Sequence, residues 1–179
     1  MSVSRKLFRL FKSVNEIQTI MKKWQENIPT AEKALPILTR LCFLFYWFFD
    51  NLGVLIKIKF ITSFDFNNAL RRANKFWLLG LFLTIVGCIK TLSELGSKAK
   101  AIKAKGDDET TTKEALAKLK ATRKTNILNL IKALGDSTTA SQGLGYPKRF
   151  LGVEFNDGIV GIGGFTSAAL TCYQQYPAK

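Results

Sequence analysis

The chain has 179 residues, enough for one domain, and 27 Lys and Arg against 13 Asp and Glu give it a formal net charge of +14. A charge of this size indicates an anionic partner, which can be nucleic acid, an anionic membrane surface or an acidic protein. The lack of histidine in the sequence excludes imidazole metal ligands and a histidine general base. No nucleic-acid signature is present, and the apolar residues gather in blocks between basic segments, so the composition favours the membrane.

Catalysis is the class of function that the sequence supports least. No nucleophile–base pair and no metal cluster is recognisable. The cysteines Cys42, Cys88 and Cys172 lie far apart, each inside an apolar block and without metal-type spacing. We therefore expect no enzyme, no metal, no cofactor and no small-molecule substrate, and three cysteines that are small buried side chains.

The first predicted element is an amphipathic helix over residues 3–24. Its apolar residues recur at spacings of three and four and form one stripe, which Phe8 and Phe11 widen: Val3, Leu7, Leu10, Val14, Ile17, Met21 and Trp24. The basic residues lie off that stripe: Arg5, Lys6, Arg9, Lys12, Lys22 and Lys23. Two interpretations stay open. The helix packs on a core or in a coiled coil, or it lies in the interface of an anionic membrane.

Two long apolar blocks follow. Pro29 and Pro36 predict a break and a restart before the first block, residues 35–61, which is too long for a strand. The second block covers residues 76–95, because its uncharged part alone falls short of the roughly 20 residues that span a bilayer. If the two form a hairpin, the basic N-terminal helix and the basic segment 97–124 share one side, as the positive-inside rule prefers.

The first block contains a carboxylate and an amide, Asp50 and Asn51. A charged side chain inside a bilayer is costly unless it is paired, so we expect both to face the helix bundle. Arg71 and Arg72, which follow the polar turn after this block, are the predicted cationic partners. The alternative is that Asp50 lies at the headgroup boundary and needs no partner.

Residues 111–135 predict a second amphipathic helix. Thr111 with Glu114 three residues later forms a plausible capping box, and Gly135 is a natural end. The apolar residues expected to face inward are Leu116, Leu119, Ile127, Leu130, Ile131 and Leu134.

The last block, residues 150–173, is rich in Gly, Ala and Ser. Gly163 with Ser167, and Gly164 with Ala168, form small-xxx-small pairs that let helices approach closely in a bilayer. The alternative is a glycine-rich loop followed by one short buried helix. If this block spanned the membrane, the C-terminus would lie on the side opposite the N-terminus, so the number of spans stays at two or three.

The order of several segments carries a family resemblance. The segments are "SRKLFRLFK" at Ser4–Lys12, "LFYWFFDNLGVLIKI" at Leu44–Ile58, "RRANKFWLLGLFL" at Arg71–Leu83, "NLIKALGD" at Asn129–Asp136 and "NDGIVGIGG" at Asn156–Gly164. In this order they resemble the peroxin-eleven family of peroxisomal membrane elongation and proliferation factors. The resemblance covers nearly the whole chain.

The resemblance implies a peroxisomal membrane protein that self-associates and whose basic amphipathic helix curves the cytosolic leaflet before fission. The remodelling helix corresponds to Ser4–Lys12 and its continuation to Trp24, the intramembrane acid to Asp50, and the basic turn to Arg71 and Arg72. Members usually carry several dozen residues before the "RKLFR" segment, so the resemblance implies a relative shortened at its N-terminus. Both termini of the family are usually described as cytosolic.

The sequence thus predicts an all-α, membrane-associated helical bundle with basic amphipathic helices and two to three hydrophobic membrane helices. The single domain is divided as follows: an amphipathic helix (1–34), a hydrophobic hairpin (35–95), a basic loop with an amphipathic helix (96–149), and a Gly-rich membrane segment (150–179).

Three functions stay open at this point. The first is a protein that shapes or scaffolds the peroxisomal membrane. The second is a structural accessory subunit of a large membrane assembly, such as one in the mitochondrial inner membrane. The third is a solute pore, which has also been suggested for the family. The expected partners are anionic lipids and either further copies of the chain or other membrane subunits, with no nucleic acid.

Overall fold

The computed structural model describes residues 12–105 and 109–176. These residues are 87% helical and contain no strand, which confirms the predicted all-α fold. Within the described ranges the helices are α2 (Lys12–Gln25), α3 (Thr30–Lys57), α4 (Phe66–Lys105), α5 (Glu109–Gly143), α6 (Tyr146–Leu151) and α7 (Asp157–Gln175).

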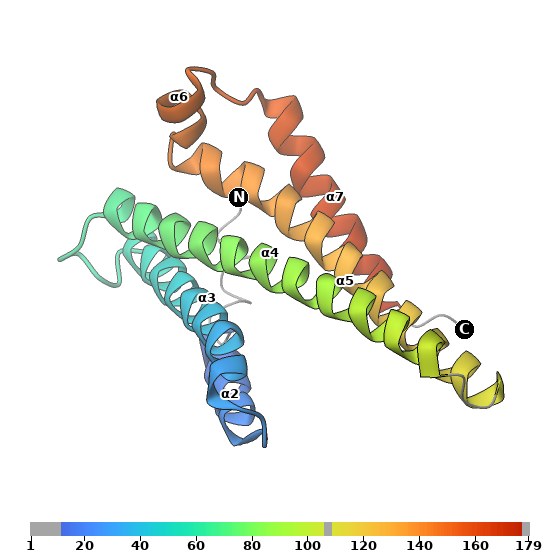
Figure 1. Ribbon diagram of the computed structural model, residues 1–179. Coiled ribbons are helices and arrows are strands. Elements are labelled where there is room, and N and C mark those ends of the chain that lie inside the picture. Colours follow the sequence, from blue (N-terminus) through green and yellow to red (C-terminus); the bar gives the residue numbers. More distant parts are fainter. Residues whose placement is uncertain (1–11, 106–108, 177–179) are drawn as a thin grey trace.

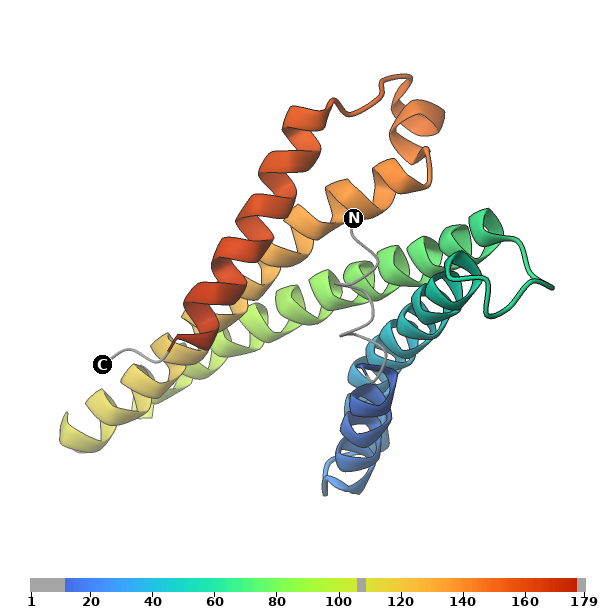
Figure 2. The same ribbon diagram turned by 180° about the vertical axis from the view of Figure 1, so that it is seen from behind.

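The helices form an open layer in which each long helix packs on the next one in the chain (Figure 1). The central helix is α4, whose 40 residues extend over about 60 Å at 1.5 Å per residue. The α2–α3 pair lies on one side of α4 and the α5–α7 pair lies on the other, as the view from behind also shows (Figure 2). The described parts of α3 and α5 do not pack on each other.

Two of the helices, α3 and α4, are long and apolar enough to cross a membrane. The predicted hairpin of two hydrophobic helices is therefore present, and α4 continues beyond residue 95 into the basic segment. The last predicted block, residues 150–173, is not one helix. Gly152, at φ 70°, ends α6, and Asn156 caps the start of α7 by accepting a hydrogen bond from the Ile159 amide at 2.8 Å.

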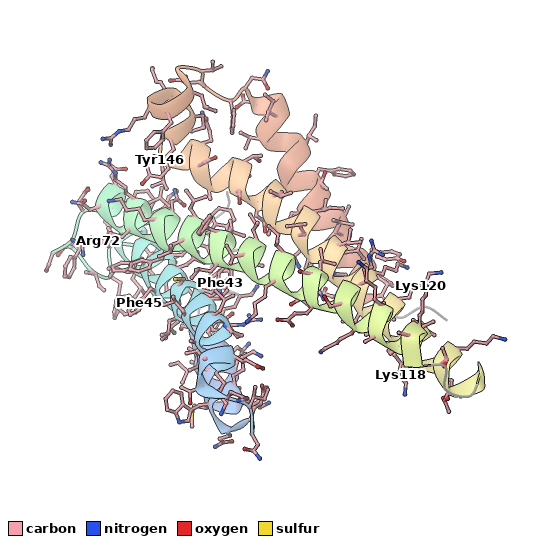
Figure 3. All side chains as sticks on the ribbon, in the orientation of Figure 1. Phe43, Phe45, Arg72, Lys118, Lys120 and Tyr146 are labelled. Carbon is pink, nitrogen blue, oxygen red and sulfur yellow. The ribbon has the colours of Figure 1, made fainter. Side chains whose placement is uncertain are left out.

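Aromatic rings hold α3 against α4. The ring of Phe76 lies 5.1 Å from that of Phe45 and 5.8 Å from that of Phe49, centre to centre, and Tyr46 stacks on Trp77 at 5.4 Å. Figure 3 shows the side chains of the two helices, with Phe43 and Phe45 labelled. At Gly80 a Cβ atom would lie only 3.2 Å from the ring of Phe43, so the missing side chain lets the rings come this close.

Small residues, by contrast, hold α5 against both of its neighbours. Ala133 and Ala140 are buried against Leu81 of α4. On the other side, Gly135 meets Gly163 of α7 so closely that a Cβ on Gly135 would lie 2.6 Å from the Gly163 carbonyl oxygen. Here the two backbones are in direct contact.

Several predicted boundaries are wrong, because tertiary packing overrides local signals. The helix does not end at Gly135 but continues to Gly143, since the glycine serves the close approach to α7 rather than a left-handed turn. Thr111 lies inside α5, which begins at Glu109, so it is not an N-cap. Pro36 lies inside α3, which begins earlier, at Thr30. The first turn of α3 is bound to the end of α2, because Lys33 Nζ donates to the Trp24 carbonyl at 3.0 Å.

Two predictions of burial also need correction. Ile127, Ile131 and Leu134 are 38–52% exposed rather than inward-facing, because the tight contact between α5 and α4 admits alanines instead. Cys42 and Cys88 are buried as expected, whereas Cys172 is exposed.

Candidate membrane interface

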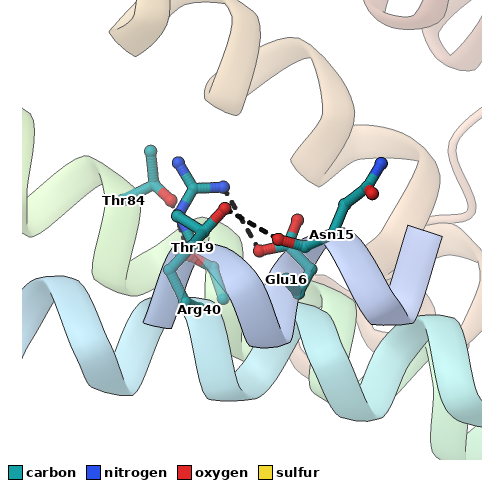
Figure 4. Close-up of polar contacts among 6 residues, drawn as sticks. Asn15, Glu16, Thr19, Arg40 and Thr84 are labelled. Atoms are coloured by element: carbon teal, nitrogen blue, oxygen red, sulfur yellow. Dashed lines mark hydrogen bonds and ion pairs between the residues drawn. The ribbon is translucent and has the colours of Figure 1, made fainter. Parts of the chain in front are cut away.

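The described part of the N-terminal helix turns its apolar stripe away from the protein. Val14, Ile17, Met21 and Trp24 are 46–67% exposed, and α2 has no buried residue. The side of α2 that meets α3 is instead mostly polar, and Glu16 Oε2 accepts from Arg40 Nη1 at 3.4 Å (Figure 4). The stripe is therefore not part of the protein's own core.

Most of the residues predicted for the interface helix lie outside the described residues: Arg5, Lys6, Leu7, Phe8, Arg9, Leu10 and Phe11. Of the two others, Lys12 has its Nζ atom 4.7 Å from the centre of the Trp47 ring, a cation–π contact with α3. Trp24 ends the exposed stripe.

The three helices at the centre of the layer carry further outward-facing apolar residues, spaced so that they share one face of each helix. We call this set the outer band: Leu38, Phe45 and Phe48 on α3, Leu79, Phe82, Val86 and Ile89 on α4, and Ile127, Ile131 and Leu134 on α5. In water such a surface would be costly, since contiguous exposed apolar patches mark sites that bind a membrane or a partner.

Basic residues flank the outer band toward both ends of the helices. Near the α3–α4 turn and the start of α4 they are Lys57, Lys59, Arg71, Arg72 and Lys75, and all five side chains are exposed. Toward the other end they are Lys98, Lys100, Lys103, Lys113, Lys118, Lys120, Arg123 and Lys124, which are exposed as well. Basic ends around an apolar middle match the two headgroup layers of a bilayer around its hydrocarbon core.

Asp50 is buried, with 6% of its surface exposed, and so does not face outward with the band. Its pairing with Arg71 or Arg72 stays a prediction. Both arginines are exposed, and the guanidinium carbon of Arg72 lies 5.8 Å from the centre of the Phe49 ring. Asn51, the neighbour of Asp50, is half-buried.

The two small-residue pairs of α7 have different surroundings. Gly163 and Ser167 are buried against α5, whereas Gly164 is half-buried and Ala168 is exposed. Next to this contact, burial raises the pKa of Asp136, and a hydrogen bond from Ser167 and the charge of Lys132 act in the opposite direction.

The opposite side of the layer from the outer band holds a cavity of about 560 Å³, which we call the polar cleft. Its polar lining is Lys12, Glu16, Lys23, Thr39, Arg40, Thr84, Asn129, Lys132, Asp136 and Thr171. The sequence reasoning missed this site. The available signals were Arg40, a charge within the first apolar block, and the Lys132–Asp136 pair one helical turn apart.

A comparison with known protein families shows to which family the chain belongs. The family described as peroxisomal biogenesis factor 11 (PEX11) matches residues 1–176. The chain belongs to the PEX11 family. No curated protein and no solved structure matches the chain.

Membership in the PEX11 family, together with the apolar helices α3 and α4, indicates association with the peroxisomal membrane. It supports a role as an elongation or proliferation factor of that membrane. The predicted resemblance to this family is thereby confirmed.

Proposed function

We propose that this PEX11 family member shapes the peroxisomal membrane by inserting the apolar stripe of α2 into the headgroup region of an anionic leaflet. The observation that carries the proposal is the outward direction of that stripe. A helix that served only its own fold would bury Val14, Ile17, Met21 and Trp24, whereas here all four are exposed. Of the two interpretations of this helix, the outward stripe favours the membrane.

The physical reason for curvature is asymmetry between the two leaflets. An amphipathic helix that lies in the interface, with its apolar face about 5–10 Å deep, expands one leaflet only. Since α2 is fixed to α3 through Glu16 and Arg40, the inserted helix stays attached to a hairpin that is long enough to span the bilayer. Lys22 and the further basic residues of the segment add attraction to anionic lipid, at about 1 kcal/mol each at most.

Self-association is the second part of the proposal, and the outer face of α7 supports it. Ile162 and Phe165 are 70% and 75% exposed, and nothing lies within 4 Å of the Cβ position of the neighbouring Gly161. A small residue between large apolar ones permits a second helix to approach closely. Copies that join through α7 would multiply the number of α2 helices inserted into one patch of leaflet.

The test uses the full chain in liposomes that contain anionic phospholipid. We expect the variant Ile17→Glu with Met21→Glu to lose membrane tubulation and, in cells, peroxisome elongation, because two carboxylates oppose insertion of the stripe. The matched control is Gln18→Glu with Gln25→Glu, which makes the same charge change at exposed polar positions of the same helix. The control should retain most of the activity.

Equal loss of tubulation in both variants would show that net charge matters and that the stripe does not. If the wild-type chain fails to tubulate but co-purifies with other membrane subunits, and only the Ile17 and Met21 variant is released from them, the chain is an accessory subunit. That outcome would replace the membrane-shaping proposal.

A further inference from the structure

We propose that the polar cleft binds the phosphate group of an anionic ligand, either a phospholipid headgroup or a free phosphate ester. The cleft lies between α2–α3 and α5–α7, over the inner face of α4. Its volume of about 560 Å³ falls within the usual range of sites for small molecules, about 300–1,000 Å³.

The charge of the lining favours an anion. The cleft is lined by four cationic side chains, Lys12, Lys23, Arg40 and Lys132, and by two carboxylates, Glu16 and Asp136. This leaves a surplus of two positive charges within the lining, on groups that three helices, α2, α3 and α5, bring together although they are far apart in sequence. A phosphate mono- or diester is the common biological anion that would balance such a surplus.

Arg40 is the residue best placed to recognise phosphate. Glu16 holds its guanidinium by a single bond, Nη1 to Oε2 at 3.4 Å, and only 15% of the Glu16 side chain is exposed (Figure 4). A guanidinium has five N–H donors in a fixed fork, so one such contact orients the group and leaves donors for a second oxygen pair. Glu16 is therefore a positioning residue for Arg40.

The threonine hydroxyl groups of the lining do not supply the donors that a phosphate needs. Thr39, Thr84 and Thr171 each donate to a backbone carbonyl one turn earlier, at 2.8 Å in every case. Recognition of the ligand thus depends on the cations. The aromatic rings of Tyr46, Trp47 and Trp77, which also line the cleft, would contact the less polar part of the ligand.

The position of the cleft along α4 gives a second argument. Thr84 and Cys88 line it, whereas Phe82 and Val86 of the same helix belong to the outer band. Arg40 of α3 and Lys132 of α5 line the same cleft as Thr84 and Cys88, so these two charges lie beside the apolar part of a helix that is fit to cross a membrane. Charges at that depth are expensive, and a bound anion would compensate the surplus. This inference does not rest on membrane shaping, because the stripe and the cleft-lining residues occupy different faces of α2.

The experiment measures binding to the full chain in nanodiscs of phosphatidylcholine. One arm adds a fluorescent phosphatidic acid to the bilayer, and the other adds glycerol 3-phosphate to the buffer. We expect saturable binding in at least one arm, and we expect Arg40→Gln with Lys132→Gln to raise the Kd at least tenfold. The matched control, Lys148→Gln with Arg149→Gln, removes the same charge from exposed positions of α6 outside the cleft and should change the Kd less than twofold.

Thr84→Leu serves as a second variant, because it narrows the cleft without altering any charge and leaves Arg40 and Lys132 in place. It should weaken binding at least threefold while the circular dichroism spectrum stays that of the wild type. Binding in the lipid arm alone assigns a phospholipid, and binding in both arms assigns a general phosphate site. An absence of saturable binding in both arms, or equal weakening by the cleft variant and its control, overturns the proposal.

Discussion

The two hairpins on either side of the fold solve the same packing problem in opposite ways. The α3–α4 hairpin is held by large rings, with Phe76 between Phe45 and Phe49 and Tyr46 stacked on Trp77. The α5–α7 hairpin is held where Gly135 and Gly163 bring two backbones together. Rings keep the axes of two helices apart and can rearrange, whereas a glycine contact has no side chain that can move aside. The second hairpin should therefore tolerate far less change at its contact than the first.

The two kinds of contact also differ in how they depend on the surrounding medium. Water drives large apolar rings together, but lipid tails are as apolar as the rings themselves. Close backbone contact gains dispersion energy in either environment. The α5–α7 contact is thus independent of whether α7 lies in lipid, beside a second copy of the chain or in water. The α3–α4 contact combines both kinds, because Gly80 lets the Phe43 ring approach α4.

The largest effect is expected from Gly163→Leu. Even a single Cβ at this position would lie 2.7 Å from the Gly135 carbonyl oxygen, so a leucine has to push α7 away from α5. We expect a loss of about 3 kcal/mol in stability, at the upper end of typical overpacking, measured by thermal unfolding of the purified chain in detergent micelles.

The control for this variant is Gly96→Leu in α4, where nothing lies within 4 Å of the Cβ position. This change should leave the melting temperature unchanged or raise it, since glycine is a weak helix former. Similar destabilisation by both variants would show that the close contact with Gly135 does not hold this hairpin together.

A smaller effect is expected from Phe76→Ala, which removes the ring that contacts both Phe45 and Phe49. Full burial of a phenylalanine would make this change cost 3–5 kcal/mol. Because Phe76 is only half-buried, we expect about 2 kcal/mol in the same unfolding assay. Phe82→Ala, in the outer band of the same helix, should cost clearly less in micelles. A greater loss for Phe82 than for Phe76 would contradict the description of the α3–α4 contact.

The smallest effect concerns α6, which connects the helices of the second hairpin. Lys148 Nζ lies 2.7 Å from Glu154 Oε1, and this pair lowers the pKa of Glu154 below its ordinary 4.5 and raises that of Lys148 above 10.5. The contribution of Glu154 is complete above pH 4.5 and is lost as the pH falls through the lower pKa of the folded state.

Both side chains are exposed, so Lys148→Ala should leave global unfolding nearly unchanged. It should speed amide hydrogen exchange slightly in α6 at pH 7, and the difference from wild type should vanish once Glu154 is protonated. If the variant and the wild type exchange at the same rate as each other at both pH values, the pair does not order α6.

Much of the fold could be predicted from the sequence because it rests on periodicity and composition. The apolar blocks predicted the hydrophobic hairpin. The spacing of Val14, Ile17 and Met21 predicted an amphipathic helix, and the ordered motifs indicated the family. The ends of helices were harder. Gly135 has the residue type of a helix end, but its missing side chain serves a neighbour that is distant in sequence.

The candidate site was predictable only in part, because it too depends on residues that are distant in sequence. The sequence identified the stripe of α2 but left open whether it faces a core or a membrane. It pointed to Asp50 as an inward-facing acid, and the structure buries it, whereas the pairing with Arg71 or Arg72 stays a prediction. The polar cleft could not be predicted from the sequence, because only the packing of the helices brings its charges to one place.

The sequence by itself determined what every segment is: an all-α chain, basic between apolar blocks, with the motifs of the PEX11 family, since these properties depend on neighbours within a few turns. Only the tertiary structure decided where each face points. It turned the stripe of α2 outward, because the polar side of that helix forms the bond between Glu16 and Arg40. It also gathered Arg40, Lys132 and Asp136 around one cleft, because α3 and α5 pack on opposite sides of α4. Such groupings bring together residues nearly a hundred positions apart, which no local pattern encodes.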